Sequence, residues 1–526
     1  MIAPRSIFND VLGPIMRGPS SSHTAGAYHI ARVTRALLGE APASVRVSFD
    51  PAGSYAPTYK ALGVDSAFCS GLLDWEMTDP RYASSTEAAR DAGVHMVFEV
   101  APLEGEEHPN AVRIEVSGRG GRVLRVHAKA TGGGAFEISR VDELPLSIDG
   151  KAWDVVAFVP ARSVDRARAA CREAAGESIE RAHLTQGDRS ILHWRSLRDV
   201  DVRRLERLAS RLGGSRFGVS PPLFFPQVGP PLFSSASEAL RLATDRRCSL
   251  GAAAVAHEMS LLDWPEAAVV SEMSRRYAIM KQAIETGLDP DRVDMPLTEP
   301  SAAGVLAADR AARLPLGGPQ TRAAARALAV MHICNSRGVV CAAPTGGSAG
   351  VLPGVLSVLE EDSSVGPAAI LRALFAASAV GLIVSARATF AAETAGCQVE
   401  IGVAGAMAAA AVIEAADGTA QQALDAASIA LQNTMGSVCD PVGGGCEIPC
   451  HTRNAAAASV AFTIADLVVG GYVNPIPLDE AVDTSLAVGM ALPSALRCTA
   501  RGGIAITPSA RRLCEKRAAR LLEDAG

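Results

Sequence analysis

The stretch "CDPVGGGCEIPCHTRN" occupies residues 439–454 and holds Cys439, Cys446 and Cys450 within twelve residues. Three consecutive glycines separate the first two cysteines, and a proline precedes the third. Glycine lets the backbone approach a bulky group closely, and proline fixes the course of a loop. The stretch therefore indicates a loop shaped around its cysteine side chains, and the rest of the chain must show what these thiols do.

The cysteines are not expected to form structural disulfides. The first eighteen residues contain no apolar run long enough for a signal peptide, so we expect a cytoplasmic protein. Thiols are kept reduced in that compartment. The eleven cysteines are then free thiols, metal ligands or catalytic groups.

Length and composition indicate a large globular protein. Its 526 residues are too many for one ordinary domain, and 48% hydrophobic with 20% charged residues is typical of globular chains. A net charge of −6 predicts no nucleic-acid partner. The apolar run 455–472 approaches the length of a membrane span, but it contains Asp466 and a Gly-Gly pair. We therefore expect it to be a buried core helix, and we expect no membrane partner.

The order of patterns along the chain predicts an α+β protein with three folded parts. Residues 1–150 mix helical stretches with β-branched runs such as "AVRIEVSG" (111–118), which predicts an N-terminal mixed α/β domain. Residues 151–215 follow a βαββα pattern that resembles small regulatory domains of the ACT type, although a spacer or dimerisation module fits equally well. A linker rich in proline and glycine is predicted at 216–233. Residues 234–526 are predicted to form a large all-α domain.

The cysteines of the C-terminal half are spaced too widely for an ordinary zinc site. Such a site needs two tight pairs, and Cys446 with Cys450 is the nearest approach to one. Cysteines dispersed over loops of small residues suit an iron–sulfur cluster better, because a cluster is bulky and needs backbone N–H groups close to its sulfides. The segments "AGCQ" (395–398), "VCDP" (438–441) and "IPCH" (448–451) offer such loops. Inert buried thiols are the alternative that spacing alone leaves open.

Seven ordered motifs extend the comparison over nearly the whole chain. They are "GPSSSHTAG" (18–26), "GSYAPTYKALGVDSAFCSGLLDW" (53–75), "EEHPNAVRIEV" (106–116), "APTGGSAGVLPGVL" (343–356), "GCQVEIGVAGAMAAAA" (396–411), "CDPVGGGCEIPCHTRNA" (439–455) and "ALPSALRCTARGGIAITPSARRL" (491–513). In this order they resemble the iron–sulfur-dependent L-serine dehydratases, in a single-chain form with fused beta-type and alpha-type domains.

The resemblance implies a [4Fe–4S] cluster held by Cys397, Cys439 and Cys450, with the fourth iron open to the substrate. Cys446 stands where the family usually has no cysteine, and we expect it to be an accessory thiol. Some family members have a terminal cysteine that reaches the open iron. Cys498 is a weak candidate for that role, as is Cys514 near the end of the chain, and packing is the alternative for both.

The resemblance also assigns catalytic residues to the segment "PSSSHT". His23 can move a proton near neutral pH, and the hydroxyl groups of Ser20, Ser21, Ser22 and Thr24 can bind a carboxylate. The alternative is a helix N-cap cluster, because Ser and Thr favour helix starts. The implied substrate-binding residues are Thr345, Gly346, Gly347, Ser348, Lys60 and Asp65. For the glycine loop at 344–350, a plain turn and helix start is the alternative.

Together these features predict a lyase that dehydrates and deaminates L-serine to pyruvate and ammonia, with the open iron as Lewis acid. The five lysines lie in no recognisable pyridoxal setting, so the sequence gives no support to a pyridoxal route. The partner is then a small amino acid substrate, and we expect a homodimer.

Departures from the family pattern affect the substrate more than the fold. Leu62 stands where the family commonly has a histidine, so a proton carried by that histidine needs another group, or the substrate differs. The alternative substrates are threonine, cysteine or a 3-hydroxy acidic amino acid, and a cluster-based sensor is the alternative of another class. Asp440 and Arg453 flank the cluster cysteines. We expect them to orient the cluster or the substrate, or to pair with each other.

Overall fold

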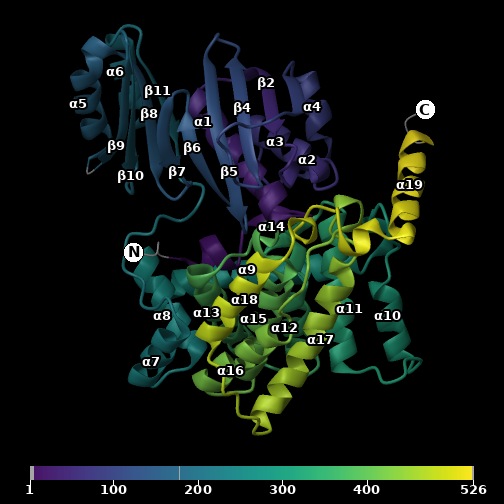
Figure 1. The fold of residues 1–526 in the computed structure, drawn as a ribbon. Helices are drawn as coiled ribbons and strands as arrows, with labels where there is room; N and C mark the ends of the chain where they lie inside the picture. Colours follow the sequence, from purple (N-terminus) through teal and green to yellow (C-terminus); the bar gives the residue numbers. More distant parts are fainter. Residues whose placement is uncertain (1–4, 177, 524–526) are drawn as a thin grey trace. The chain divides into compact units, whose positions relative to one another are not determined.

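The computed structural model describes residues 5–176 and 178–523 (Figure 1). The chain divides into two compact units. The helical unit comprises the N-terminal segment up to Thr24, the short piece Lys60–Leu62 and the chain from Gly229 onward. The mixed unit comprises Ala25–Tyr59 and Gly63–Val228. The α+β class and the helical C-terminal region are therefore confirmed.

A six-stranded sheet forms the first part of the mixed unit. Its order is β3-β2-β4-β5-β6-β7, with β2 parallel to β3 and the other neighbours antiparallel. Helix α1 packs on β5 and β6, and a Cβ atom at Gly26 would lie 2.7 Å from the Cβ of Ala130, so this close approach requires glycine. The elements are α1 (Gly26–Leu38), β2 (Pro42–Phe49), α2 (Tyr55–Thr58), α3 (Val64–Leu72), α4 (Ser85–Asp91), β3 (His95–Val100), β4 (Ala111–Gly118), β5 (Val123–Gly132), β6 (Ala135–Val141) and β7 (Leu144–Ile148).

A four-stranded antiparallel sheet forms the second part of the mixed unit, in the order β11-β8-β10-β9. Its apolar face, with Val155, Leu192 and Trp194, packs against residues of its two helices. The predicted βαββα succession is present, and a further strand follows it within the segment 216–233 that was predicted to be a linker. The proline-rich residues that follow this short strand masked it in the sequence. The elements are β8 (Trp153–Pro160), α5 (Val164–Ala175), β9 (Ile179–Gln186), β10 (Arg189–Ser196), α6 (Val202–Arg211) and β11 (Arg216–Ser220).

The core of the helical unit consists of helices with small side chains. Helix α15 is buried along nearly its whole length and contacts α12, α13, α16 and α17 (Figure 1). The helices are α7 (Ala236–Arg246), α8 (Leu250–Leu262), α9 (Glu266–Gly287), α10 (Ala302–Arg310), α11 (Pro319–Asn335), α12 (Val351–Glu361), α13 (Pro367–Arg387), α14 (Ala392–Ala395), α15 (Ile401–Ala415), α16 (Ala420–Gln432), α17 (Cys450–Val469), α18 (Leu478–Ala491) and α19 (Pro508–Glu523).

Two apolar stretches of this unit, Pro367–Arg387 and Cys397–Ala415, are long enough to cross a membrane. Their most apolar windows are 78% and 94% buried inside the described structure, so both fit core helices of a soluble protein. The run 455–472, which was predicted to be a buried core helix, falls mostly in α17. That helix is buried on one face only, and Leu467 and Val469 on the other face are about half exposed.

A two-stranded antiparallel sheet joins the N-terminal segment of the helical unit to the middle of its long C-terminal part. Strand β1 (Ile15–Arg17) pairs with β12 (Val339–Cys341), with Met16 opposite Val340. Each strand is followed directly by a loop that carries predicted site residues, 18–26 after β1 and 343–350 after β12. Because the strands are antiparallel, the two loops leave opposite ends of this three-residue ladder, and they nevertheless meet where the Gly346 N–H donates to the Ser21 hydroxyl at 3.2 Å.

Glu258 on α8 is buried and holds the N-terminal segment in place through hydrogen bonds. Its carboxylate accepts hydrogen bonds from the Ser6 hydroxyl at 2.5 Å and from the Ile7 backbone N–H at 2.8 Å. These donors stand at the start of the helical turn Ile7–Val11, where backbone N–H groups have no partner within the turn. Burial raises the pKa of Glu258 to about 7.

We expect Glu258 to make the stability of the helical unit depend on pH. An acid whose pKa is raised on folding destabilises the fold once it ionises, so stability falls as pH rises from about 4.5 to about 7. This span corresponds to about 3 kcal/mol. Thermal melting at about pH 5 and about pH 8 should show a smaller loss of melting temperature for Glu258→Gln than for the wild type. Glu285→Gln, an exposed control on α9, should follow the wild type, and equal pH dependence in all three proteins would contradict the assignment.

Candidate functional site

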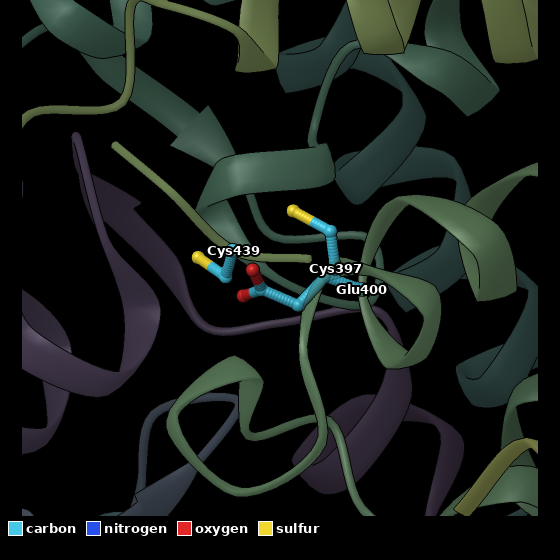
Figure 2. A group of neighbouring side chains, drawn as sticks. All are labelled: Cys397, Glu400 and Cys439. Atoms are coloured by element: carbon cyan, nitrogen blue, oxygen red, sulfur yellow. The ribbon is translucent and has the colours of Figure 1, made fainter. Parts of the chain in front are cut away.

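The three predicted metal ligands come from three separate segments of the helical unit. Cys397 starts the short turn before α15, Cys439 precedes the glycine-rich loop, and Cys450 is the first residue of α17. All three are buried. The sulfur atoms of Cys397 and Cys439 and a carboxylate oxygen of Glu400 lie within 4.8 Å of one another (Figure 2). The Cys450 thiol hydrogen-bonds to Cys397, so the structure brings the three thiols together.

Two further cysteines border this group. The Cys446 thiol contacts that of Cys450, and the Cys498 thiol contacts that of Cys439. Backbone pairing holds Cys498 in place, because its N–H donates to the carbonyl of Cys439 at 2.8 Å. Cys446 therefore lies beside the three cysteines, and its accessory role stays a prediction. Of the two weak candidates for a capping thiol, Cys498 borders the site, whereas Cys514 lies in α19.

The pKa values of the three thiols are shifted in opposite directions. Hydrogen bonds from Cys439 and Cys450, together with the nearby Arg453 guanidinium, lower the pKa of Cys397 well below its usual value. The same hydrogen bonds to Cys397 raise the pKa of Cys439 and of Cys450. A buried set of three cysteine thiols, with a loop that contains three glycines after Cys439, matches the preference of iron–sulfur clusters for cysteine ligands and close backbone approach. The residues present therefore fit such a group.

Glu400 was not singled out from the sequence. Its pKa is raised well above the ordinary value by burial and by the neighbouring Cys397 thiolate, while a hydrogen bond with Thr345 acts in the opposite direction. The only sequence signal was its position three residues after Cys397, at the beginning of α15. Glu400 thus links the cysteines to the glycine loop.

Arg453 and Asp440 form an ion pair beside the cysteines, which confirms the pairing that the sequence suggested. The Arg453 guanidinium lies 3.1 Å from the Asp440 carboxylate and also donates to the carbonyl of Val438 at 2.7 Å. The second carboxylate oxygen of Asp440 accepts from the backbone N–H of Ile504 at 2.8 Å. The pair therefore fixes the segments on both sides of Cys439, while any role toward a cluster or substrate stays a prediction.

The glycine loop lies between the serine-rich loop and Glu400. The Gly346 N–H donates to the Ser21 hydroxyl at 3.2 Å, and a Cβ atom at Gly346 would lie 3.1 Å from the Pro19 carbonyl oxygen. A Cβ atom at Gly347 would lie 3.7 Å from the Glu400 carboxylate. The absence of side chains at these glycines thus allows Ser21 and Glu400 to approach the same short loop.

Thr345 and Ser348 at the ends of this loop already bond to each other. Their hydroxyl oxygens are 3.0 Å apart, and the Thr345 N–H donates to the Ser348 hydroxyl at 3.2 Å. This capping box confirms the turn and helix start that were the alternative interpretation. Its role in substrate binding stays a prediction.

His23 is buried one turn into the serine-rich loop. Its Nδ1 lies 3.4 Å from the Ser20 hydroxyl, which also accepts the His23 backbone N–H at 3.2 Å. The cap interpretation therefore holds for Ser20. Burial lowers the pKa of His23 to about 3, so its ring is neutral near pH 7 and has a nitrogen able to accept a proton.

The remaining predicted residues are distributed over both units. Ser22 and Thr24 are buried in the serine-rich loop, and the Thr24 hydroxyl donates to the carbonyl of Leu62 at 2.7 Å. The residue in place of the family histidine therefore lies next to this loop. Lys60 is exposed in the same short piece of chain. Asp65 belongs to the mixed unit, where its carboxylate accepts the Ser66 N–H at 2.8 Å in the first turn of α3.

The family described as serine dehydratase alpha chain matches residues 167–505, which include all of these cysteines except Cys514. This chain belongs to that family. A probable L-serine dehydratase alpha chain of Bacillus subtilis is 35% identical over 54% of this chain and 95% of its own length. A probable L-serine dehydratase beta chain of the same organism is 41% identical over 28% of this chain and 64% of its own length. An L-serine dehydratase of Haemophilus influenzae is 31% identical over 53% of this chain and 62% of its own length.

Within this member of the serine dehydratase alpha chain family, a cavity of about 370 Å³ reaches Cys397. It lies between α15, α16 and α17, and Cys397 and Arg453 are part of its wall. The other lining residues are mostly small, such as Gly402, Gly405 and Ala457. Open space next to the buried thiols is therefore available within the helical unit.

Asn454 connects the glycine loop of this family member to the cysteine-bearing helix. Its amide nitrogen donates to the carbonyls of Gly347 and Cys450, at 2.9 and 2.8 Å. Its amide oxygen accepts the Gly350 N–H at 3.2 Å. One buried side chain thus satisfies three backbone groups from two segments.

Replacing Asn454 by alanine should loosen the site without removing a ligand. The buried backbone groups of Gly347 and Gly350 would lose their partner, at a cost of about 2 kcal/mol. We expect a lower melting temperature and faster loss of bound iron under anaerobic conditions. Asn433→Ala, which removes one hydrogen bond to the carbonyl of Ile429 on α16, should retain iron like the wild type. Iron retention by Asn454→Ala equal to that of the control would contradict this role.

Proposed function

We propose that this protein is a cytoplasmic lyase that dehydrates and deaminates L-serine to pyruvate and ammonia, and that Cys397, Cys439 and Cys450 hold a [4Fe–4S] cluster. The observation that carries the proposal is the convergence of these three buried thiols from separate segments. The names of the relatives, which include an alpha chain, a beta chain and an L-serine dehydratase, support the substrate.

Dehydration of serine requires loss of a weakly acidic Cα proton and departure of the β-hydroxyl. Cys397, Cys439 and Cys450 would hold the cluster, which when bound would supply Lewis-acid chemistry toward the substrate oxygens. The released aminoacrylate tautomerises, and water then converts it to pyruvate and ammonia.

The residues around the thiols provide the rest of the site. The Ser21 hydroxyl lies next to the glycine loop, and Ser22 is buried in the same serine-rich loop; we expect both hydroxyls to bind a substrate carboxylate. His23 is neutral, so it can accept a proton without first losing one. Burial of the loop limits access of water, which strengthens electrostatic contacts within the site.

Leu62 favours a second candidate, the same reaction on another β-substituted amino acid. Its side chain is buried, and its carbonyl accepts the Thr24 hydroxyl beside His23. A leucine cannot carry a proton, and it offers an apolar surface where the family has an imidazole. Threonine, with one more methyl group than serine, is the simplest substrate that fits this change.

Removal of any one of the three proposed ligands should abolish both cluster and reaction. We expect Cys397→Ala, Cys439→Ala and Cys450→Ala each to lose iron, the brown colour of the anaerobic protein and pyruvate formation, because two thiolates cannot retain the cluster. The control is Cys248→Ala, between α7 and α8, which should retain all three properties. Full iron content and activity in any ligand variant would remove that cysteine from the proposed set.

An anaerobic substrate panel tests the reaction itself. With L-serine, the reconstituted protein should form pyruvate and ammonia in equal amounts, and D-serine should yield neither. Products can be measured by coupled reduction of the 2-oxo acid and by ammonia assay. Turnover of L-threonine without turnover of L-serine would overturn the first candidate in favour of the second, and no turnover of any β-substituted amino acid by iron-loaded protein would overturn both.

A further inference from the structure

The mixed unit contains a cavity of about 550 Å³ that has no role in the proposed function. One wall comes from the start of β5 and the turn between β6 and β7, in the six-stranded sheet. The other wall comes from β8, β9, β10 and β11 of the four-stranded sheet. Its volume falls within the range of small-molecule sites, about 300–1,000 Å³.

The charges that line this cavity are predominantly positive. Four arginines contribute to its wall, against the two carboxylates of Asp142 and Glu143. The Asp142 carboxylate is already engaged, since it accepts the Arg125 backbone N–H at 2.8 Å. Burial also raises the pKa of Asp142, which disfavours its negative charge. The arginines are Arg122, Arg125, Arg189 and Arg216.

Arg216 at the start of β11 is held rigidly with an unused donor. Its guanidinium carbon lies 3.5 Å from the centre of the Phe158 ring, and Nη2 donates to the carbonyl of Val123 at 3.3 Å. Nη1 is buried and has no hydrogen-bond partner among the described residues. Leaving a buried donor on a charged group unpaired is costly, so this nitrogen points to an acceptor supplied by a ligand.

Arg189 at the start of β10 supplies a second uncommitted guanidinium. No hydrogen bond or ion pair of its side chain occurs within residues 5–176 and 178–523. By contrast, the Arg122 guanidinium lies 3.5 Å from the Glu40 carboxylate, and that of Arg125 lies 3.3 Å from Glu115. The two arginines with free donors, Arg189 and Arg216, thus belong to the four-stranded sheet. Arg122 and Arg125, whose guanidinium groups lie next to carboxylates, belong to the six-stranded sheet.

We propose that this cavity binds a small multivalent anion, a phosphate compound or a polycarboxylate, with Arg189 and Arg216 as its principal contacts. Planar guanidinium groups bind the oxygens of phosphates and carboxylates through paired hydrogen bonds. Four arginines opposite two carboxylates call for a ligand with a net negative charge. A zwitterionic amino acid such as serine fits poorly, because its ammonium group would face the arginines.

Isothermal titration of the full-length protein with inorganic phosphate and with citrate tests the proposal. Ionic strength is held constant with sodium chloride, and L-serine is titrated in parallel. We expect at least one of the two anions to bind with a Kd of about 1 mM or tighter. The tighter of the two indicates whether the ligand is a phosphate compound or a polycarboxylate.

Arginine variants assign the binding to this cavity. Arg189→Gln should weaken it by about ten-fold or more, as expected for loss of a hydrogen bond to a charged group. Arg189 is exposed, so this variant should fold even where Arg216→Gln does not. Arg90→Gln, an exposed control on α4, should bind like the wild type.

Three outcomes would overturn the proposal. They are the absence of saturable binding of both anions, equal binding by Arg189→Gln and the wild type, and an equal loss in Arg90→Gln. None of these measurements depends on serine turnover. A negative result would therefore overturn the anion-binding proposal without bearing on the proposed reaction.

Discussion

The site depends on one constraint, which is that the thiols of Cys439 and Cys450 must both lie next to the buried thiol of Cys397. Cys397 accepts from Cys439 and Cys450, and this mutual contact forces three distant segments into one place. Each segment is held by backbone and polar bonds of its own. Asp440 and Arg453 fix the segment of Cys439, and Asn454 ties the helix of Cys450 to the glycine loop. The thiols are therefore placed by the surrounding chain before any metal group binds.

The fold class could be predicted from the sequence because its signals are local, whereas the three thiols were identified by the resemblance of the motifs around them to a known family. Alternating β-branched runs, alanine-rich helices and cysteines on glycine loops each occupy a short window. The same applies to the pairing of Asp440 with Arg453, thirteen residues apart. The structure confirms that these features exist and that the thiols meet.

Other features depend on long-range contacts that no short window reveals. Strand β1 has three residues and pairs with a strand more than three hundred residues later, so neither shows a strand signal. Glu258 and Glu400 look like ordinary helix-surface glutamates, because only the tertiary structure buries Glu258 and brings the partly exposed Glu400 next to Cys397. Strand β11 was hidden by the prolines that follow it. In each case a tertiary partner, and not local propensity, determines the environment.

The β1–β12 pairing has a consequence for the architecture of the chain. The loop that carries His23 is attached to the helical unit by a strand that precedes the whole mixed unit in sequence. If the same parts were made as two polypeptides divided between residues 228 and 229, the N-terminal segment of the first would have to bind to the helical part of the second. Assembly would then depend on the concentration of both polypeptides. A continuous chain makes that capture intramolecular, with a high effective concentration set by the tether. Fusion thus fixes a one-to-one ratio of the His23 loop and the helical unit to which it is attached.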